Sequence, residues 1–130
     1  MSIFRQTARS EKCVGGSTIL KIAGIQFAAV EDKEKNVKKA MKFADVAVES
    51  GAKLISFAEL FTTHWFAHEE NVDPSRAVPF AEPIPGPTTE EFSALAKKKG
   101  VVMVLPIAEL EDDRVYNSAA VIDADGSLLG

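Results

Sequence analysis

The chain has little of several components that would point to a function by composition alone. It contains one cysteine, Cys13, in 130 residues, which excludes an internal disulfide and fits a reducing compartment such as the cytoplasm. Basic residues number 15 against 19 acidic ones, so the net charge of −4 gives no reason to expect nucleic acid as a partner. No apolar run approaches the roughly 20 residues of a membrane-spanning helix, so no membrane partner is expected.

The first twenty residues lack the continuous apolar core of a secretory signal. They carry Arg5, Arg9 and Lys12 against a single acidic residue, and we interpret residues 1–20 as a flexible leader, with a transit peptide as the minority alternative. Residues 21–130 then fit one domain, because hydrophobic residues make up 46% and charged residues 26% of the chain, an ordinary globular balance.

Strand and helix patterns alternate along this domain. The expected elements are strands at 21–27 and 53–58, helices at 32–50 and 88–99, and strands at 101–105, 115–123 and from 127 onwards. The first helix repeats its apolar residues at three- and four-residue spacing, and Thr88 and Glu91 have the spacing of a capping box at the start of the second. Alternation of this kind favours an α/β fold with parallel strand pairs, to which the last two strands add an antiparallel hairpin.

A long segment, residues 61–87, separates the second strand from the second helix. It is rich in proline, and loops of this length inside compact domains are often functional. His64 and His68 are four residues apart, but no glutamate directly follows the first. We therefore favour a place at a pocket rim or exposure to solvent over metal binding for these histidines. Three aromatic residues are candidates for substrate contact, with loop packing as the alternative: Phe61, Trp65 and Phe66.

Glutamates follow two of the predicted strands. Glu59 comes directly after the apolar strand at 53–58, and sites in open α/β sheets gather outside such strand ends. A carboxyl beside an apolar wall is desolvated, which raises its pKa and suits a general base; the alternative is a solvated residue that ends the strand. Glu109 and Glu111 follow the next strand, and taken alone they are better interpreted as a solvated acidic turn. Parallel strands would place all three at one edge of the sheet.

Four segments in this order resemble the nitrilase superfamily of carbon–nitrogen hydrolases. They are the strand at 21–27, Phe57-Ala58-Glu59-Leu60-Phe61, Ile84-Pro85-Gly86-Pro87-Thr88-Thr89, and the hairpin from Tyr116 to Gly126. The resemblance covers about residues 20 to 130 and is nearest to members that cleave N-carbamoyl amines or N-carbamoyl amino acids. It implies a small amide or N-carbamoyl substrate.

The resemblance implies a Glu–Lys–Cys catalytic set without metal or cofactor. Glu59 matches the general base that activates a cysteine thiol, and the thiolate would form a thioester that water then hydrolyses. Glu111 matches a second, orienting glutamate, with Glu109 as the competing candidate. The lysine and the cysteine are expected beyond Gly130, and Cys13 cannot replace the latter because it precedes Glu59.

The family fold implied by the resemblance is a four-layer αββα sandwich, of which this chain would supply about one half. Two helices would cover one face of a mixed sheet, and the other face would expect the missing half. An uncovered apolar face promotes association, so we expect a homo-oligomer or another partner chain. The alternatives to an enzyme are a non-catalytic truncated or split subunit that pairs with another chain, and an unrelated small α/β binding domain.

Overall fold

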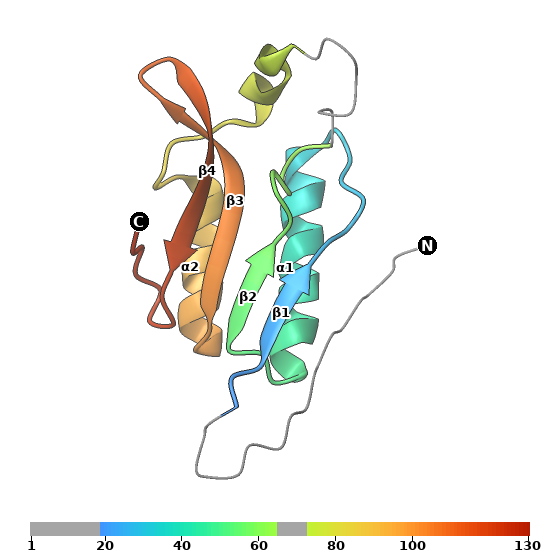
Figure 1. Cartoon of the computed structure of the whole chain (residues 1–130), viewed down its shortest axis with the longest axis vertical. Helices are drawn as coiled ribbons and strands as arrows, with labels where there is room; N and C mark the ends of the chain where they lie inside the picture. Colours follow the sequence, from blue (N-terminus) through green and yellow to red (C-terminus); the bar gives the residue numbers. More distant parts are fainter. Residues whose placement is uncertain (1–18, 65–72) are drawn as a thin grey trace.

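The structure, a computed structural model, describes residues 19–64 and 73–130. Its elements are β1 (Ile22–Ile25), α1 (Lys33–Glu49), β2 (Leu54–Phe57), a 3-10 helix η1 (Pro74–Phe80), α2 (Pro87–Lys99), β3 (Val102–Glu111) and β4 (Arg114–Ile122). The described strands form one sheet in the order β1-β2-β3-β4, with parallel pairs up to β3 and an antiparallel β3–β4 pair. Both α1 and α2 lie behind this sheet in Figure 1. The prediction of an α/β fold with two helices on one face of a mixed sheet is confirmed.

The hydrophobic core lies between the sheet and these two helices. Alternate residues of β3 point into it, because successive side chains of a strand face opposite sides. The buried core side chains on the strands and on α2 include Ile55, Phe57, Phe92, Leu95, Met103, Leu105, Ile107, Ala120 and Ile122. From α1 come mainly alanines, Ala40, Ala44 and Ala47, whose small side chains let the helix approach the sheet closely. None of the helices within residues 19–64 and 73–130 is long and apolar enough to cross a membrane.

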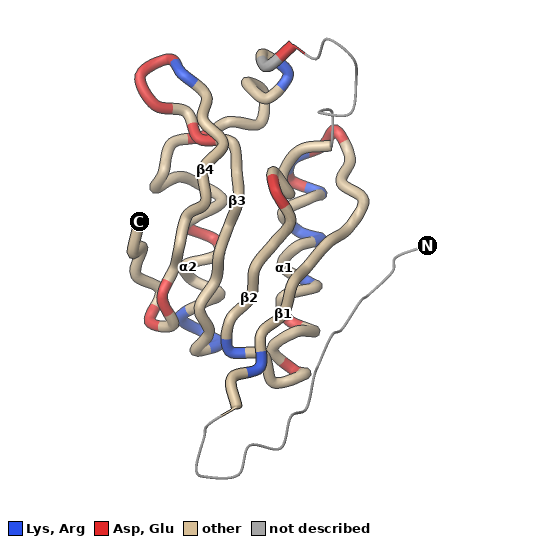
Figure 2. Tube along the Cα trace, in the orientation of Figure 1, with Lys and Arg blue, Asp and Glu red and all other residues tan. Residues whose placement is uncertain are grey.

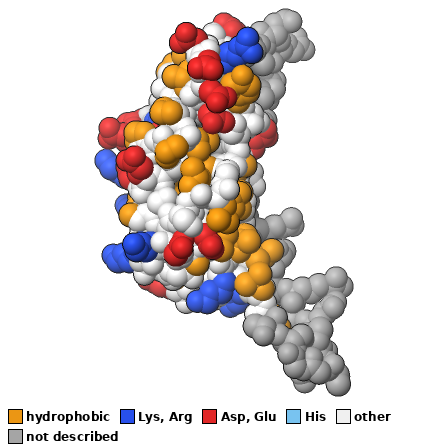
Figure 3. Space-filling view, turned by 90° about the vertical axis from the view of Figure 1, so that its left-hand side faces the viewer, with side chains coloured by type: hydrophobic (Ala, Val, Ile, Leu, Met, Phe, Trp, Pro, Cys, Tyr) orange, Lys and Arg blue, Asp and Glu red, His pale blue; other side chains and the backbone are white. Residues whose placement is uncertain are grey.

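The opposite face of the sheet, called here the open face, is only partly covered. Ala108, on this face, is buried under Ala77 and Leu60. The rest of the face consists of Ile22, Leu54, Ser56, Val102, Val104, Pro106, Ala119 and Val121, none of which is buried. Ile22 is 64% exposed, for example. Figure 3 views the molecule from the side of β4 and α2 and shows hydrophobic side chains running along it. The 3-10 helix η1 lies near the upper end of the molecule in Figure 1. Its Ala77 packs against Ala108 of β3.

β3 is longer than the sequence pattern predicted. It continues to Glu111, and the connection to β4 is a two-residue turn in which Asp112 (φ 47°) and Asp113 (φ 61°) are both left-handed. This is the backbone that tight hairpins favour, and aspartate tolerates it. The prediction that the strand ends at 105 was therefore wrong, because Glu109 and Glu111 both belong to β3, and only Glu111 is exposed beside the turn. Figure 2 shows the acidic residues gathered at the tip of this hairpin.

The start of α2 also differs from its prediction. Gly86 is the N-cap, and its backbone N–H donates to Thr89 Oγ1 at 2.7 Å while that hydroxyl donates back to the Gly86 carbonyl at 2.8 Å. The predicted pair of Thr88 and Glu91 was wrong because the N-cap lies two residues earlier, and Pro87, with its fixed φ, is the first helical residue. The strand expected from 127 onwards is reduced to a single bridge between Ile122 and Leu128.

Candidate active site

Glu59 lies in a tight turn at the carboxyl end of β2. The Ala58 N–H still donates to the Ile25 carbonyl at 2.9 Å, so the chain leaves the sheet only at Glu59. The next residue, Leu60, has φ 50°, which costs a non-glycine residue about 1–2 kcal/mol. Thr63 holds this backbone, because its N–H and its hydroxyl donate to the Leu60 carbonyl at 2.9 and 3.2 Å. Strained backbone of this kind is concentrated at functional sites.

The carboxylate of Glu59 is bound by the hairpin. Oε1 accepts a hydrogen bond of 2.6 Å from Nδ2 of Asn117, which lies on β4 opposite Ala108 of β3. β3 therefore lies between Glu59 and Asn117. The turn that contains Glu59 crosses β3 at Ala108, whose side chain is only a methyl group. Leu60 packs in the same place, against the cluster of Ala77 and Ala108. Glu59 is exposed, so the described residues do not form the apolar wall that the sequence led us to expect around it.

The two candidate second glutamates differ in their surroundings. Glu109 is half-buried, and its Oε2 accepts a hydrogen bond of 2.5 Å from Ser118 Oγ. Glu111 is exposed beside the hairpin turn and lies opposite Arg114. The local geometry therefore favours Glu109 over Glu111 as a held carboxylate, although an orienting role for either stays a prediction.

Adjacent residues of β4 hold the two candidate carboxylates. Asn117 binds Glu59, and Ser118 binds Glu109. Because consecutive strand residues point to opposite faces, the two bonds lie on opposite faces of the hairpin. Glu59 and Glu109 thus share one end of the sheet, as parallel pairing of β2 and β3 requires, but not one face.

Of the aromatic candidates for substrate contact, the structure describes only Phe61, because Trp65 and Phe66 lie outside the described residues. Phe61 is 3% exposed, stacks on Phe57 at a centroid distance of 4.7 Å and meets Phe92 edge-on at 5.8 Å. Its ring anchors the chain in the core directly after the Glu59 turn. Contact with substrate stays a prediction that these packing contacts do not support.

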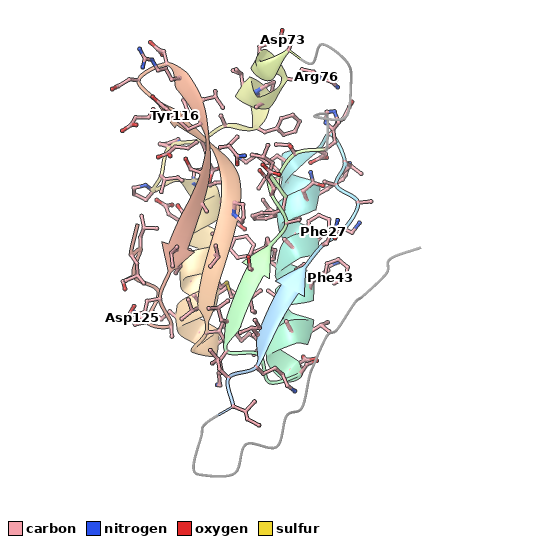
Figure 4. All side chains as sticks on the ribbon, viewed as in Figure 1. Phe27, Phe43, Asp73, Arg76, Tyr116 and Asp125 are labelled. Atoms are coloured by element: carbon pink, nitrogen blue, oxygen red, sulfur yellow. The ribbon has the colours of Figure 1, made fainter. Side chains whose placement is uncertain are left out.

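His64 fastens the same segment to η1. Its Nε2 lies 3.0 Å from Nη2 of Arg76, and its ring packs edge-on to Phe80 at 6.0 Å. Arg76 and Tyr116 are labelled in Figure 4, both at the upper end of the molecule. His68, the other histidine of the predicted pair, lies outside the described residues. Within residues 19–64 and 73–130, no three metal-binding side chains come together.

Sequence reasoning missed Asn36, a buried polar residue of α1 that is hydrogen-bonded to the segment following Glu59. It is 1% exposed, its Nδ2 donates to the carbonyls of Val30 and Thr62 at 2.7 and 3.0 Å, and its Oδ1 accepts from Val30 N–H at 2.8 Å. All three bonds go to backbone, so Asn36 ties α1 to the loops that follow β1 and β2. The signal in the sequence was a polar residue inside the apolar stripe of a predicted helix.

Glu82 was also missed, although it is the most buried charged side chain in the described part of the chain, at 6% exposure. Its carboxylate contacts Lys33 Nζ at 2.5 Å and the backbone N–H and hydroxyl of Thr88 at 2.8 and 3.0 Å. Its own backbone pairs with β3 through Ala108 O and Leu110 N–H. Glu82 therefore connects α1, α2 and the end of β3. A cavity of about 480 Å³ beside it is lined mainly by charged side chains from both helices.

Known proteins resemble this chain over most of its length. It is 35% identical over 113 residues to N-carbamoylputrescine amidase of Solanum lycopersicum, covering 86% of this chain and 37% of that protein. It is 32% identical over 114 residues to omega-amidase NIT2 of Homo sapiens, covering 86% of this chain and 38% of that protein. The chain thus spans under two fifths of the length of these relatives.

A solved structure shares the fold. The carbon-nitrogen hydrolase from Helicobacter pylori G27 superposes with a TM-score of 0.70 at 24% identity, over 85% of this chain and 38% of that one. The sequence profile of the family described as carbon-nitrogen hydrolase matches residues 21–130. This match confirms the resemblance seen in the sequence motifs, and the chain belongs to the carbon–nitrogen hydrolase family.

Proposed function

We propose that the protein hydrolyses a non-peptide C–N bond in a small amide or N-carbamoyl compound, with Glu59 as the general base. The observation that carries this proposal is an accessible carboxylate, held by Asn117, on a strained turn at the carboxyl end of a parallel strand. Membership of the family and the names of the relatives, an N-carbamoyl amidase and an omega-amidase, agree with this reaction.

The reaction also needs a thiol and a cation close to Glu59. Glu59 takes the thiol proton, and the thiolate attacks the carbonyl carbon to form a tetrahedral oxyanion, which a lysine ammonium stabilises. The C–N bond breaks as the amine takes the proton from Glu59, leaving an acyl or carbamoyl thioester. Glu59 then takes a proton from water, whose oxygen attacks the thioester, and the thiol is restored. The chain spans under two fifths of the length of its relatives, and we expect the part of that length which it does not match, or a partner chain, to supply both groups.

The products distinguish the two substrate classes. Hydrolysis of an N-carbamoyl amine gives the amine, carbon dioxide and ammonia, with one carbon dioxide for each ammonia. Hydrolysis of a simple amide gives the acid and ammonia without carbon dioxide. Measuring both gases over a set of N-carbamoyl amines, N-carbamoyl amino acids and ω-amides therefore assigns the class before the substrate itself is identified.

The test of the mechanism is Glu59→Gln in the native polypeptide that carries this chain. We expect kcat/KM to fall by about a hundredfold or more, because a positioned base contributes about 10²–10⁴-fold. Glu49→Gln, at the exposed end of α1, is the matched control and should keep full activity. Unchanged turnover in the Glu59 variant would remove this carboxylate from the mechanism.

A second candidate function is that of a non-catalytic subunit, which the partly covered apolar face favours. In that case the protein would release no ammonia from any substrate and would co-purify with another chain in a fixed ratio. Loss of that complex on placing a charge at Val104, in the middle of the open face, would support the subunit function. Ammonia release that depends on Glu59 would contradict it.

A further inference from the structure

The hydrogen bond between Asn117 and Glu59 is a contact to which the proposed function gives no role. It joins residues 58 apart in sequence, on the two sides of β3, at 2.6 Å between Nδ2 and Oε1. We propose that Asn117 is a positioning residue, which holds one oxygen of Glu59 so that the other faces the incoming thiol. This inference rests on the proposed function of Glu59.

An exposed glutamate needs such a partner in order to act from one position. Its side chain has several rotatable bonds, and fixing a long side chain in one rotamer costs up to about 1.5–2 kcal/mol. A carboxylate only accepts, so the amide of Asn117 must present its Nδ2 end, and the orientation of both groups follows from the chemistry. The amide is also neutral, so it steadies Glu59 without adding a cation that would oppose proton uptake by the base.

The position of Asn117 is fixed by the hairpin. Asp112 and Asp113 form the two-residue turn that determines the register, and that register places Asn117 opposite Ala108. A slip of one residue would turn Asn117 to the other face. Ser118 opposes such a slip, because its bond to Glu109 lies on the other face of the same strand. One turn therefore positions donors for both carboxylates.

The first test examines the contact itself by NMR. The side-chain amide signal of Asn117 should shift as the pH is lowered through the range where glutamate takes up a proton. It should lose that shift in Glu59→Gln, which cannot titrate. Tyr116→Phe is the control, since it changes the neighbouring residue of β4 and should leave the response of the Asn117 signal to pH unchanged. An Asn117 signal that ignores pH in the unaltered protein would overturn the inference.

The second test examines catalysis in the native polypeptide. Asn117→Ala should lower kcat about tenfold to a hundredfold with KM little changed, because the base is misplaced while substrate binding is kept. Asn117→Asp has the same shape but cannot donate and adds a negative charge, so the acidic limb of the kcat/KM profile should move to higher pH. Tyr116→Phe, the neighbouring residue on β4, should leave both quantities unchanged.

The outcomes separate this inference from the proposed function. If Glu59→Gln keeps its turnover, the function of Glu59 fails whatever Asn117 does. If Glu59→Gln is inactive but Asn117→Ala and Asn117→Asp keep the kcat and the pH profile of the unaltered protein, the inference about Asn117 fails alone. Thermal unfolding of each variant shows whether a loss of activity is only a loss of fold.

Discussion

The carboxylate of Glu82 accepts a hydrogen bond of 2.8 Å from the backbone N–H of Thr88, so a buried negative charge closes the N-terminus of α2. The helix dipole favours a negative charge at this end. The same carboxylate meets Lys33 of α1, which compensates its burial. The two helices behind the sheet are thereby joined at their N-termini by one side chain of an irregular segment.

The first prediction concerns this side chain. Glu82→Gln should lower the free energy of unfolding by about 1–3 kcal/mol, because it leaves Lys33, only 25% exposed, without its counter-charge and weakens the bonds to Thr88. Urea unfolding measures the change. Lys35→Gln removes the exposed pair with Asp32 and serves as the control, with little change expected. Equal midpoints for the two variants would contradict a stabilising role for Glu82.

Gly86 gives a second prediction, because its neighbours leave no room for a side chain. A Cβ at Gly86 would lie 2.3 Å from the carbonyl oxygen of Pro83, which is backbone and cannot move aside on its own. Gly86→Ala should therefore destabilise the protein by about 1–3 kcal/mol. Gly24→Ala in β1 is the control, since nothing lies within 4 Å of its added Cβ. A neutral Gly86→Ala would mean that the turn before α2 adjusts freely.

Ala108 gives a third prediction, because the Glu59 turn folds over its methyl group. Ala108→Leu should displace Leu60 and η1 and break the bond between Glu59 and Asn117, at a cost of about 1–3 kcal/mol from overpacking. Thermal unfolding measures the loss of stability, and the pH response of the Asn117 amide signal reports whether the bond to Glu59 is broken. Ala119→Leu, on the exposed part of the same face, is the matched control and should leave both readings close to those of the unaltered protein.

A fourth prediction concerns acid. The side chain of Lys35, and then its backbone N–H, donate to Asp32 at the start of α1 and lower the pKa of that carboxyl below its ordinary value of 3.8. Since the folded-state pKa is the lower one, the contribution of this cap is complete above pH 3.8 and is lost as the pH falls through the folded-state pKa. Asp32→Asn cannot titrate, so it should lose less stability over that acid range. Parallel curves of unfolding free energy against pH would contradict this.

The sequence predicted the α/β framework because that framework depends on local periodicity. The helix at 33–49 and the parallel strands were visible as spacings of apolar residues. Glu59 was also singled out from its position, as the first polar residue after a buried strand, and its role stays a prediction. Periodicity could not predict the length of β3, because the glutamates at the end of this strand have the composition of a solvated turn.

The missed residues depend on contacts between distant parts of the chain. The buried carboxylate of Glu82 has Lys33, 49 residues earlier, as its counter-charge. Asn117 matters only because the hairpin register carries it to Glu59, and neither spacing nor composition contains that register. Asn36 could have been identified from the sequence, since a polar residue on the apolar stripe of a helix needs hydrogen-bond partners once it is buried. Partners of this kind become visible only in the folded chain.

The last prediction concerns the open face. Val104 lies at its middle, between Ser56 of β2 and Val121 of β4, and is half-buried rather than covered. An apolar sheet face of this kind promotes association, so the isolated chain should form concentration-dependent oligomers in sedimentation velocity. Val104→Lys should shift the population toward the monomer, because association would then bury a charge. Val46→Lys, at a 45% exposed position on α1, is the control and should leave the distribution unchanged. A monodisperse monomer that unfolds cooperatively, with Val104 intact, would show that this face is stable in water and that the chain needs no covering partner.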